Sequence, residues 1–116
     1  MYLIKLNATS STNDFLKHLA VKQSLSNFTV VWADVQTNGR GQMGAEWVTE
    51  SSKNLTFSGL LNSLNLQTPD LFTLNVMIAN AVSKALESYN LTNIWVKWPN
   101  DILSYNKKVA GILIEN

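Results

Sequence analysis

A glycine-rich loop between two strand-like segments limits the folds open to this chain. The loop, TNGRGQMGAEW at residues 37–47, contains the pattern G-x-G-x-x-G at Gly39, Gly41 and Gly44. In a dinucleotide-binding fold that pattern follows a strand and opens a helix, because the pyrophosphate lies at the helix N-terminus. Residues 28–35 supply the strand, but residues 45–52 carry no apolar helical stripe. A dinucleotide-binding fold is therefore disfavoured, and a P-loop, which ends in Gly-Lys-Ser/Thr, is excluded.

Two interpretations of the loop remain at this point. Its glycines permit close approach of the backbone to a ligand, and the planar guanidinium of Arg40 suits a carboxylate or a phosphate. The alternative is a flexible hairpin loop with a solvated arginine. The loop by itself does not decide between them.

The hydrophobic pattern predicts an α+β fold in which helices pack on a mixed sheet. We expect strands at residues 2–6, 28–35, 54–61 and 94–98, a hairpin over 102–114 that turns at Asn106-Lys107, and helices at about 12–23 and 69–90. The second helix is predicted to begin at Thr68-Pro69-Asp70, since these residues are typical of a helix start. Its expected apolar face is Leu71, Leu74, Ile78, Ala81, Val82, Ala85 and Tyr89. In the strand at 54–61, Leu55, Phe57 and Gly59 are expected to form the apolar face.

Composition narrows the classes of function. The chain of 116 residues is long enough for one domain or part of one. Its net charge of +1 gives no indication of a nucleic-acid partner, and none is expected, although a local basic site stays open. It lacks cysteine, which excludes disulfides, thiolate metal sites and cysteine nucleophiles. No segment has the pattern of a secretory signal or a membrane span, so a cytoplasmic protein without a membrane partner is expected.

A second cluster lies at residues 94–101, IWVKWPND. Strand alternation places Trp95 and Lys97 on one face, and a lysine between tryptophans is not expected to be fully solvated. One interpretation is a lysine whose stem packs on indole, followed by the turn residues Asn100 and Asp101. The other is an ammonium directed into a pocket to neutralise a carboxylate or a phosphate.

Four motifs, in their order and spacing, resemble the catalytic domain of biotin protein ligases. They are Ser11-Thr12-Asn13, Gly39-Arg40-Gly41-x-x-Gly44-x-x-Trp47, Lys97-Trp98-Pro99-Asn100-Asp101 and Lys108-Val109-Ala110-Gly111-Ile112-Leu113. The resemblance covers nearly the whole chain, and Lys-Trp-Pro-Asn-Asp is its most specific element. It implies a fold related to class II aminoacyl-tRNA synthetases. It also implies that residues 1–116 are the N-terminal part of that catalytic domain, apparently truncated, without a DNA-binding domain or the SH3-like domain.

The resemblance also implies an activity and a biotin site. Such ligases form biotinyl-5′-adenylate from biotin and ATP, with Mg²⁺ carried on the ATP rather than held in a protein metal site. They then transfer biotin to a lysine of a biotin carboxyl carrier protein. Ser11, Thr12 and Gln36 would bind the ureido head of biotin, and Gly39 and Arg40 would lie along its tail and carboxylate. From the residues alone, helix capping and strand-end hydrogen bonding are the favoured explanation of the first three.

The nucleotide site implied by the resemblance consists of Arg40, Gln42, Trp47 and Lys97. Trp47 would pack on adenine, and Gln42 would donate hydrogen bonds in a loop that keeps one arginine, Arg40. Lys97, together with Arg40, would carry the chemistry. A fixed ammonium at Lys97 would lower the repulsion between the biotin carboxylate and the α-phosphate of ATP. Lys97 would therefore contact both biotin and ATP.

Two hypotheses of different class follow for the chain. In one it is part of a biotin protein ligase. In the other it is a truncated, non-catalytic binding or assembly module that needs a second chain. Ile112, Leu113 and Ile114 are expected to form an exposed strand edge, which favours a homo-oligomer or another pairing.

Overall fold

The protein is described by a computed structural model at residues 1–62 and 71–116. Contacts divide the chain into two units, Met1–Asn65 and Leu66–Asn116, and each unit is considered by itself. The predicted helix start at Thr68-Pro69-Asp70 lies outside the described residues. No helix within the described residues is both long and apolar enough to pass through a bilayer.

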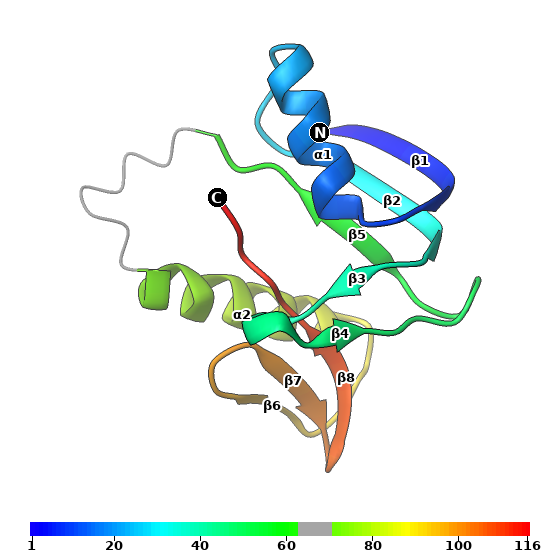
Figure 1. Cartoon of the computed structure of the whole chain (residues 1–116). Helices are drawn as coiled ribbons and strands as arrows, with labels where there is room; N and C mark the ends of the chain where they lie inside the picture. Colours follow the sequence, from blue (N-terminus) through cyan, green and yellow to red (C-terminus); the bar gives the residue numbers. More distant parts are fainter. Residues whose placement is uncertain (63–70) are drawn as a thin grey trace. The chain divides into compact units, whose positions relative to one another are not determined.

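The first unit is built on a β-α-β arrangement. Strand β1 (Tyr2–Thr9) leads into helix α1 (Thr12–Lys22), and the chain returns in β2 (Thr29–Gln36), parallel to β1. Strand β5 (Thr56–Gly59) then pairs antiparallel with the other edge of β2 (Figure 1). All four elements were predicted, and β1 extends three residues beyond its predicted end.

Helix α1 packs against one face of this sheet. The side chains that β5 directs to this face are not the ones predicted. Val31, Ala33 and Leu16 are buried between helix and sheet, and Ser58 of β5 is buried with them. Phe57, which was predicted to face the core, is 52% exposed on the opposite face. The strand was predicted correctly and its inner face wrongly, because the hydroxyl side of β5 meets polar side chains of α1.

The glycine-rich loop is a small hairpin. Strand β3 (Gly39–Arg40) pairs antiparallel with β4 (Glu46–Trp47), and the 3₁₀ turn η1 (Gln42–Gly44) connects them. At the turn, Gly44 has φ +77° and Met43 has φ +56°, so the chain reverses through left-handed backbone. Backbone hydrogen bonds between Gly41 and Ala45 and between Ala45 and Gln42 close the turn.

The second unit holds helix α2 (Leu71–Ser88) and an antiparallel sheet of β6 (Ile94–Lys97), β7 (Asp101–Ser104) and β8 (Lys107–Gly111). Part of the predicted apolar face of α2 is wrong: Leu71 and Tyr89 are 52% and 80% exposed, and Ala81 and Ala85 are also exposed. The helix instead buries Ala79 and Ser83, with Leu74, Ile78 and Val82 partly covered. The face is therefore rotated by part of a turn.

The end of the second unit corrects two further expectations. The hairpin turns at Tyr105 and Asn106, one residue earlier than predicted, and β8 ends at Gly111. Residues 112–114 are partly buried and lie outside any strand, so the predicted exposed edge is absent from this part of the chain. Asn100 instead holds this segment through two hydrogen bonds with Ile112, at 3.0 Å and 2.8 Å.

The predicted α+β class is confirmed, with one difference in architecture. The described residues form three sheets, of three, two and three strands, instead of one. The first of them is mixed, because β1 is parallel and β5 antiparallel to β2.

Candidate active site

A buried hydroxyl network lies where helix α1 begins. Ser11 is the N-cap residue, and its Oγ accepts a hydrogen bond from the Asp14 N–H at 3.3 Å. Thr12 follows as the first helical residue, and the two side chains are only 3% and 4% exposed. The capping interpretation is therefore confirmed for Ser11. Capping does not explain the contacts of Thr12, which are made with other strands.

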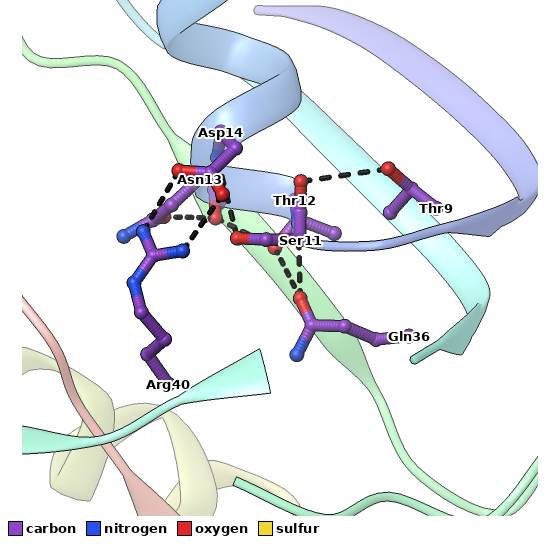
Figure 2. Close-up of polar contacts among 8 residues, drawn as sticks. Thr9, Ser11, Thr12, Asn13, Asp14, Gln36 and Arg40 are labelled. Carbon is purple, nitrogen blue, oxygen red and sulfur yellow. Dashed lines mark hydrogen bonds and ion pairs between the residues drawn. The ribbon is translucent and has the colours of Figure 1, made fainter. Parts of the chain in front are cut away.

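Thr12 joins the ends of two strands to the helix. Gln36 Oε1, at the end of β2, accepts hydrogen bonds from Thr12 N at 2.9 Å and from Thr12 Oγ1 at 3.2 Å (Figure 2). Thr12 Oγ1 also lies 2.7 Å from Ser58 Oγ of β5, and Ser58 in turn donates to Asn13 Oδ1. The structure thus brings the predicted residues Thr12 and Gln36 together and adds Ser58 and Asn13 to them.

Proton counting shows what this network can still bind. Three oxygen–oxygen contacts link the chain Gln36–Thr12–Ser58–Asn13, but the two hydroxyls supply only two hydrogens. Each hydroxyl has one hydrogen and two acceptor positions, so Thr12, with two oxygen neighbours, keeps a third hydrogen-bonding position. Both hydrogens are used within these contacts, so the position left on Thr12 Oγ1 can accept an N–H from a neutral ligand but cannot donate to its carbonyl.

Gly39 is required by the close approach of β2 and β4. A Cβ at this position would lie 2.5 Å from Gln36 Nε2 and 2.5 Å from the backbone oxygen of Trp47. Such distances are far inside van der Waals contact, so any side chain would push the hairpin away from Gln36. The glycine therefore places Arg40 and Trp47 next to the end of β2.

Arg40 forms a bidentate ion pair with Asp14 on the first turn of α1. Its Nη1 donates to Asp14 Oδ2 at 2.7 Å, and its Nη2 donates to Oδ1 at 2.8 Å (Figure 2). The hydrogen bond from Arg40 lowers the pKa of Asp14 below its ordinary value, against a smaller opposing effect of burial. The alternative of a solvated Arg40 is contradicted by this ion pair, and sequence reasoning gave Asp14 no role.

The remaining loop residues are placed less tightly. Trp47 is partly buried and pairs with Gly39 through its backbone, and Gln42 is a partly exposed residue at the start of the turn. Met43 is fully exposed at the tip. The roles of Gln42 and Trp47 toward a nucleotide stay predictions.

Lys97 lies in the second unit, at the end of β6. Lys97 is an exposed residue, and Trp95 and Trp98 are 46% and 69% exposed. The expectation that Lys97 is not fully solvated stays a prediction. Asp101 stands opposite Lys97 in the ladder but forms its ion pair with Lys108, at 2.8 Å. Among residues 1–62 and 71–116, no hydrogen bond or ion pair engages the Lys97 ammonium.

The described residues contain no group of three or more carboxylates, histidines or cysteines that could hold a metal ion. Phosphate oxygens of a nucleotide are a usual source of ligands for Mg²⁺.

Comparison with known proteins identifies the family to which this fold belongs. Residues 6–116 match the pattern of the biotin/lipoate A/B protein ligase family. The chain therefore belongs to the biotin/lipoate A/B protein ligase family, and within it the chain is similar to the catalytic domain of biotin protein ligases.

Individual relatives agree with this assignment. The bifunctional ligase/repressor BirA of Bacillus spizizenii is 36% identical, over 98% of this chain and 34% of the relative. The biotin–[acetyl-CoA-carboxylase] ligase of Paracoccus denitrificans is 34% identical, over 96% of this chain and 45% of the relative. A solved structure of the biotin protein ligase of Aquifex aeolicus in complex with biotin and ATP superimposes with a TM-score of 0.85 at 36% identity, covering 99% of this chain and 47% of that one. The chain thus spans between a third and a half of these relatives.

Proposed function

We propose that this chain provides a biotin- and ATP-binding part of a biotin protein ligase. In this function biotin and ATP give biotinyl-5′-adenylate and pyrophosphate, and the biotinyl group then passes to a lysine of a biotin carboxyl carrier protein. The observation that carries the proposal is the network of Thr12, Gln36 and Ser58 beside the buried N-cap residue Ser11, in a chain of this family. The name of the Paracoccus relative points to a carrier protein of acetyl-CoA carboxylase as the partner.

The contacts suggest a role for each part of the biotin site. Thr12, with its spare hydrogen-bonding position, would meet the ureido group of biotin, and Gln36 would orient Thr12 through two hydrogen bonds. Ser11 would hold the helix start rigid through its N-cap hydrogen bond. Gly39 would allow the hairpin to lie close enough for Arg40 to reach the carboxylate of biotin.

The proposed chemistry rests on Lys97. The biotin carboxylate attacks the α-phosphorus of ATP, and pyrophosphate leaves with the electron pair of the broken P–O bond. Charge gathers on the phosphoryl oxygens in the transition state, where a fixed ammonium stabilises it more than in the ground state. An exposed lysine without an internal partner is available for that task. Magnesium would enter on the ATP, and Gln42 and Trp47 would contact the nucleotide.

Biotin-dependent exchange of pyrophosphate into ATP tests this function, because it reports adenylate formation without the acceptor protein. Lys97→Ala is the test variant, and Lys107→Ala is the matched control, an exposed lysine of the same sheet. We expect exchange that requires biotin, that lipoate does not support, and that is lost only in Lys97→Ala. Equal exchange in both variants would remove Lys97 from the chemistry.

A second candidate function is a non-catalytic module that joins another polypeptide. The observation that favours it is the sheet face away from α1, where Leu3 and Phe57 are each 52% exposed, in a chain that spans less than half of its relatives. Sedimentation at several concentrations distinguishes the two candidates. Biotin-dependent exchange by a monomer would contradict the module, whereas a defined dimer without exchange would contradict a self-sufficient ligase.

A further inference from the structure

Asp14 is a charged group of the candidate site that no motif covers. It is the third residue of α1, and both of its carboxylate oxygens accept hydrogen bonds from Arg40, at 2.7 Å and 2.8 Å (Figure 2). The two side chains are 35% and 34% exposed. A small anion in solution can therefore reach the pair without any rearrangement of the core.

The contact uses the two terminal nitrogens of Arg40 in the geometry that recognises a carboxylate end-on. Asp14 therefore occupies the same donors that a ligand carboxylate would need for that geometry. Arg40 is also the single arginine of the chain, so no second guanidinium can take over. Any acid that binds Arg40 in this way must first displace Asp14.

We propose that Asp14 is a specificity-determining residue, an internal counter-ion that the carboxylate of the bound acid displaces from Arg40. The inference rests on the proposed function, in which Arg40 meets the carboxylate of biotin. An acid loses affinity in this exchange, because one carboxylate–guanidinium pair is broken for each one formed. An acid whose head group also fills the Thr12 network regains that loss, whereas a short acid without such a head group does not.

The electrostatics of the first turn support this competition. The hydrogen bond from Arg40, with smaller attractions to Lys17 and His18, keeps the pKa of Asp14 below its ordinary value. The carboxylate is therefore charged at neutral pH, where the ligand acid is charged as well. Two anions then compete for one guanidinium.

Calorimetric binding of biotin and of its neutral amide to the full chain tests the inference. The variant is Asp14→Asn, and the matched control is Asp34→Asn, an acid of similar exposure that pairs with Lys5 at 3.7 Å. We expect the ratio of biotin to amide affinity to rise about two- to fivefold in Asp14→Asn, the range of an exposed ion pair, and to stay unchanged in Asp34→Asn. A ratio that is unchanged or lower in Asp14→Asn would overturn the inference, since an acid that merely shapes the helix start affects both ligands alike.

A second measurement separates this inference from the proposed function. Because Arg40 is the only arginine, protein labelled with ¹⁵N-arginine gives one side-chain Nε signal, which can be followed while pentanoate is added. Pentanoate carries the carboxylate tail without the ureido head. We expect it to shift the signal at two- to fivefold lower concentration in Asp14→Asn than in the wild type. Equal midpoints would contradict the inference, even if biotin binds as proposed.

Failure of biotin to bind would contradict the proposed function for this chain, and the pentanoate titration would still decide the role of Asp14. Asp14→Ser provides a second neutral variant if Asp14→Asn does not fold, since serine is also favourable near a helix start. Either variant must give the same displacement of the midpoint.

Discussion

The two units differ in whether their candidate site residues have hydrogen-bond or ion-pair partners within the unit. At the start of α1 each functional side chain already has an internal partner: Thr12 with Gln36 and Ser58, and Arg40 with Asp14. In the second unit Lys97 is exposed, and the neighbouring carboxylate of Asp101 is held by Lys108. The first arrangement fixes the positions of these side chains, and in the second no described side chain is paired with the Lys97 ammonium. Changes in the first unit should therefore affect stability and binding, and a change at Lys97 should affect chemistry alone.

The largest expected effect is that of Lys97→Ala on the exchange reaction. Removing one group that stabilises developing charge costs about 3 kcal/mol or more in the transition state, or about 100-fold in rate. Because Lys97 is exposed and without an internal partner, the midpoint of thermal unfolding should stay within about 1 °C of the wild type. The exchange rate and the thermal unfolding midpoint, measured on the same samples, check the expected loss of activity and the expected unchanged stability. A loss of activity that parallels a loss of stability would contradict the contrast between the units.

Gly39→Ala should give the largest loss of stability in the first unit. The added Cβ would lie 2.5 Å from a backbone oxygen, so β4 must move, at a cost of about 1–3 kcal/mol. The control is Gly59→Ala in β5, where the nearest atom to a new Cβ is a Val30 methyl at 3.9 Å. We expect that control to be neutral or slightly stabilising in urea unfolding. Equal effects at both positions would mean that the hairpin is not held against Gln36.

Ser58→Ala tests whether the hydroxyl network contributes to stability. The substitution removes the hydroxyl that Thr12 Oγ1 and Asn13 Oδ1 both contact in a site closed to water at Thr12, which costs about 1–2 kcal/mol. Ser104→Ala in the second unit removes a similar hydrogen bond, to Thr92 O at 2.7 Å, from an exposed site. It should cost less than about 0.5 kcal/mol, since water replaces the lost partner. Urea unfolding of both variants checks the difference.

Much of the fold was predictable from sequence because its signals are local. Strands at β2 and β6 and the helix start at Ser11 follow from β-branched runs and a capping side chain. The inner face of β5 was not predictable, because alternation marks Phe57 as apolar and cannot show that α1 presents Thr12 and Asn13 to the other side. The turn at Tyr105 was also missed, since a non-glycine residue there adopts φ +54° and the local sequence favoured Asn106.

The site was predictable to the extent that a motif marks it. Thr12 and Gln36 were expected together from the resemblance, and the structure joins them. Ser58 and Asp14 carried no such signal, because their roles arise from partners 46 and 26 positions away in the sequence. An acidic residue in the first turn of a helix is common, because it interacts favourably with the helix macrodipole. Only the position of Arg40 reveals a second role for Asp14.

The smallest expected effect is the pH dependence of the Asp14–Arg40 pair. The folded protein holds the pKa of Asp14 below its ordinary value of 3.8, so the pair stabilises the fold fully above that pH. As pH falls from 3.8 through the lower folded value, the proton neutralises the carboxylate and the stabilisation is lost. The guanidinium of Arg40 cannot be deprotonated in this range, so the change belongs to Asp14.

The difference in free energy of unfolding between the wild type and Asp14→Asn isolates this pair, because contributions common to both proteins cancel in the difference. We expect a constant difference from neutral pH down to about 4, and a smaller difference at lower pH. A difference that grows on acidification would reverse the sign required by a lowered pKa. It would mean that Arg40 is not the partner that matters to Asp14 in solution. The first unit would then lack its Asp14–Arg40 ion pair in solution. The contrast with the exposed Lys97 of the second unit would rest on the hydroxyl network alone.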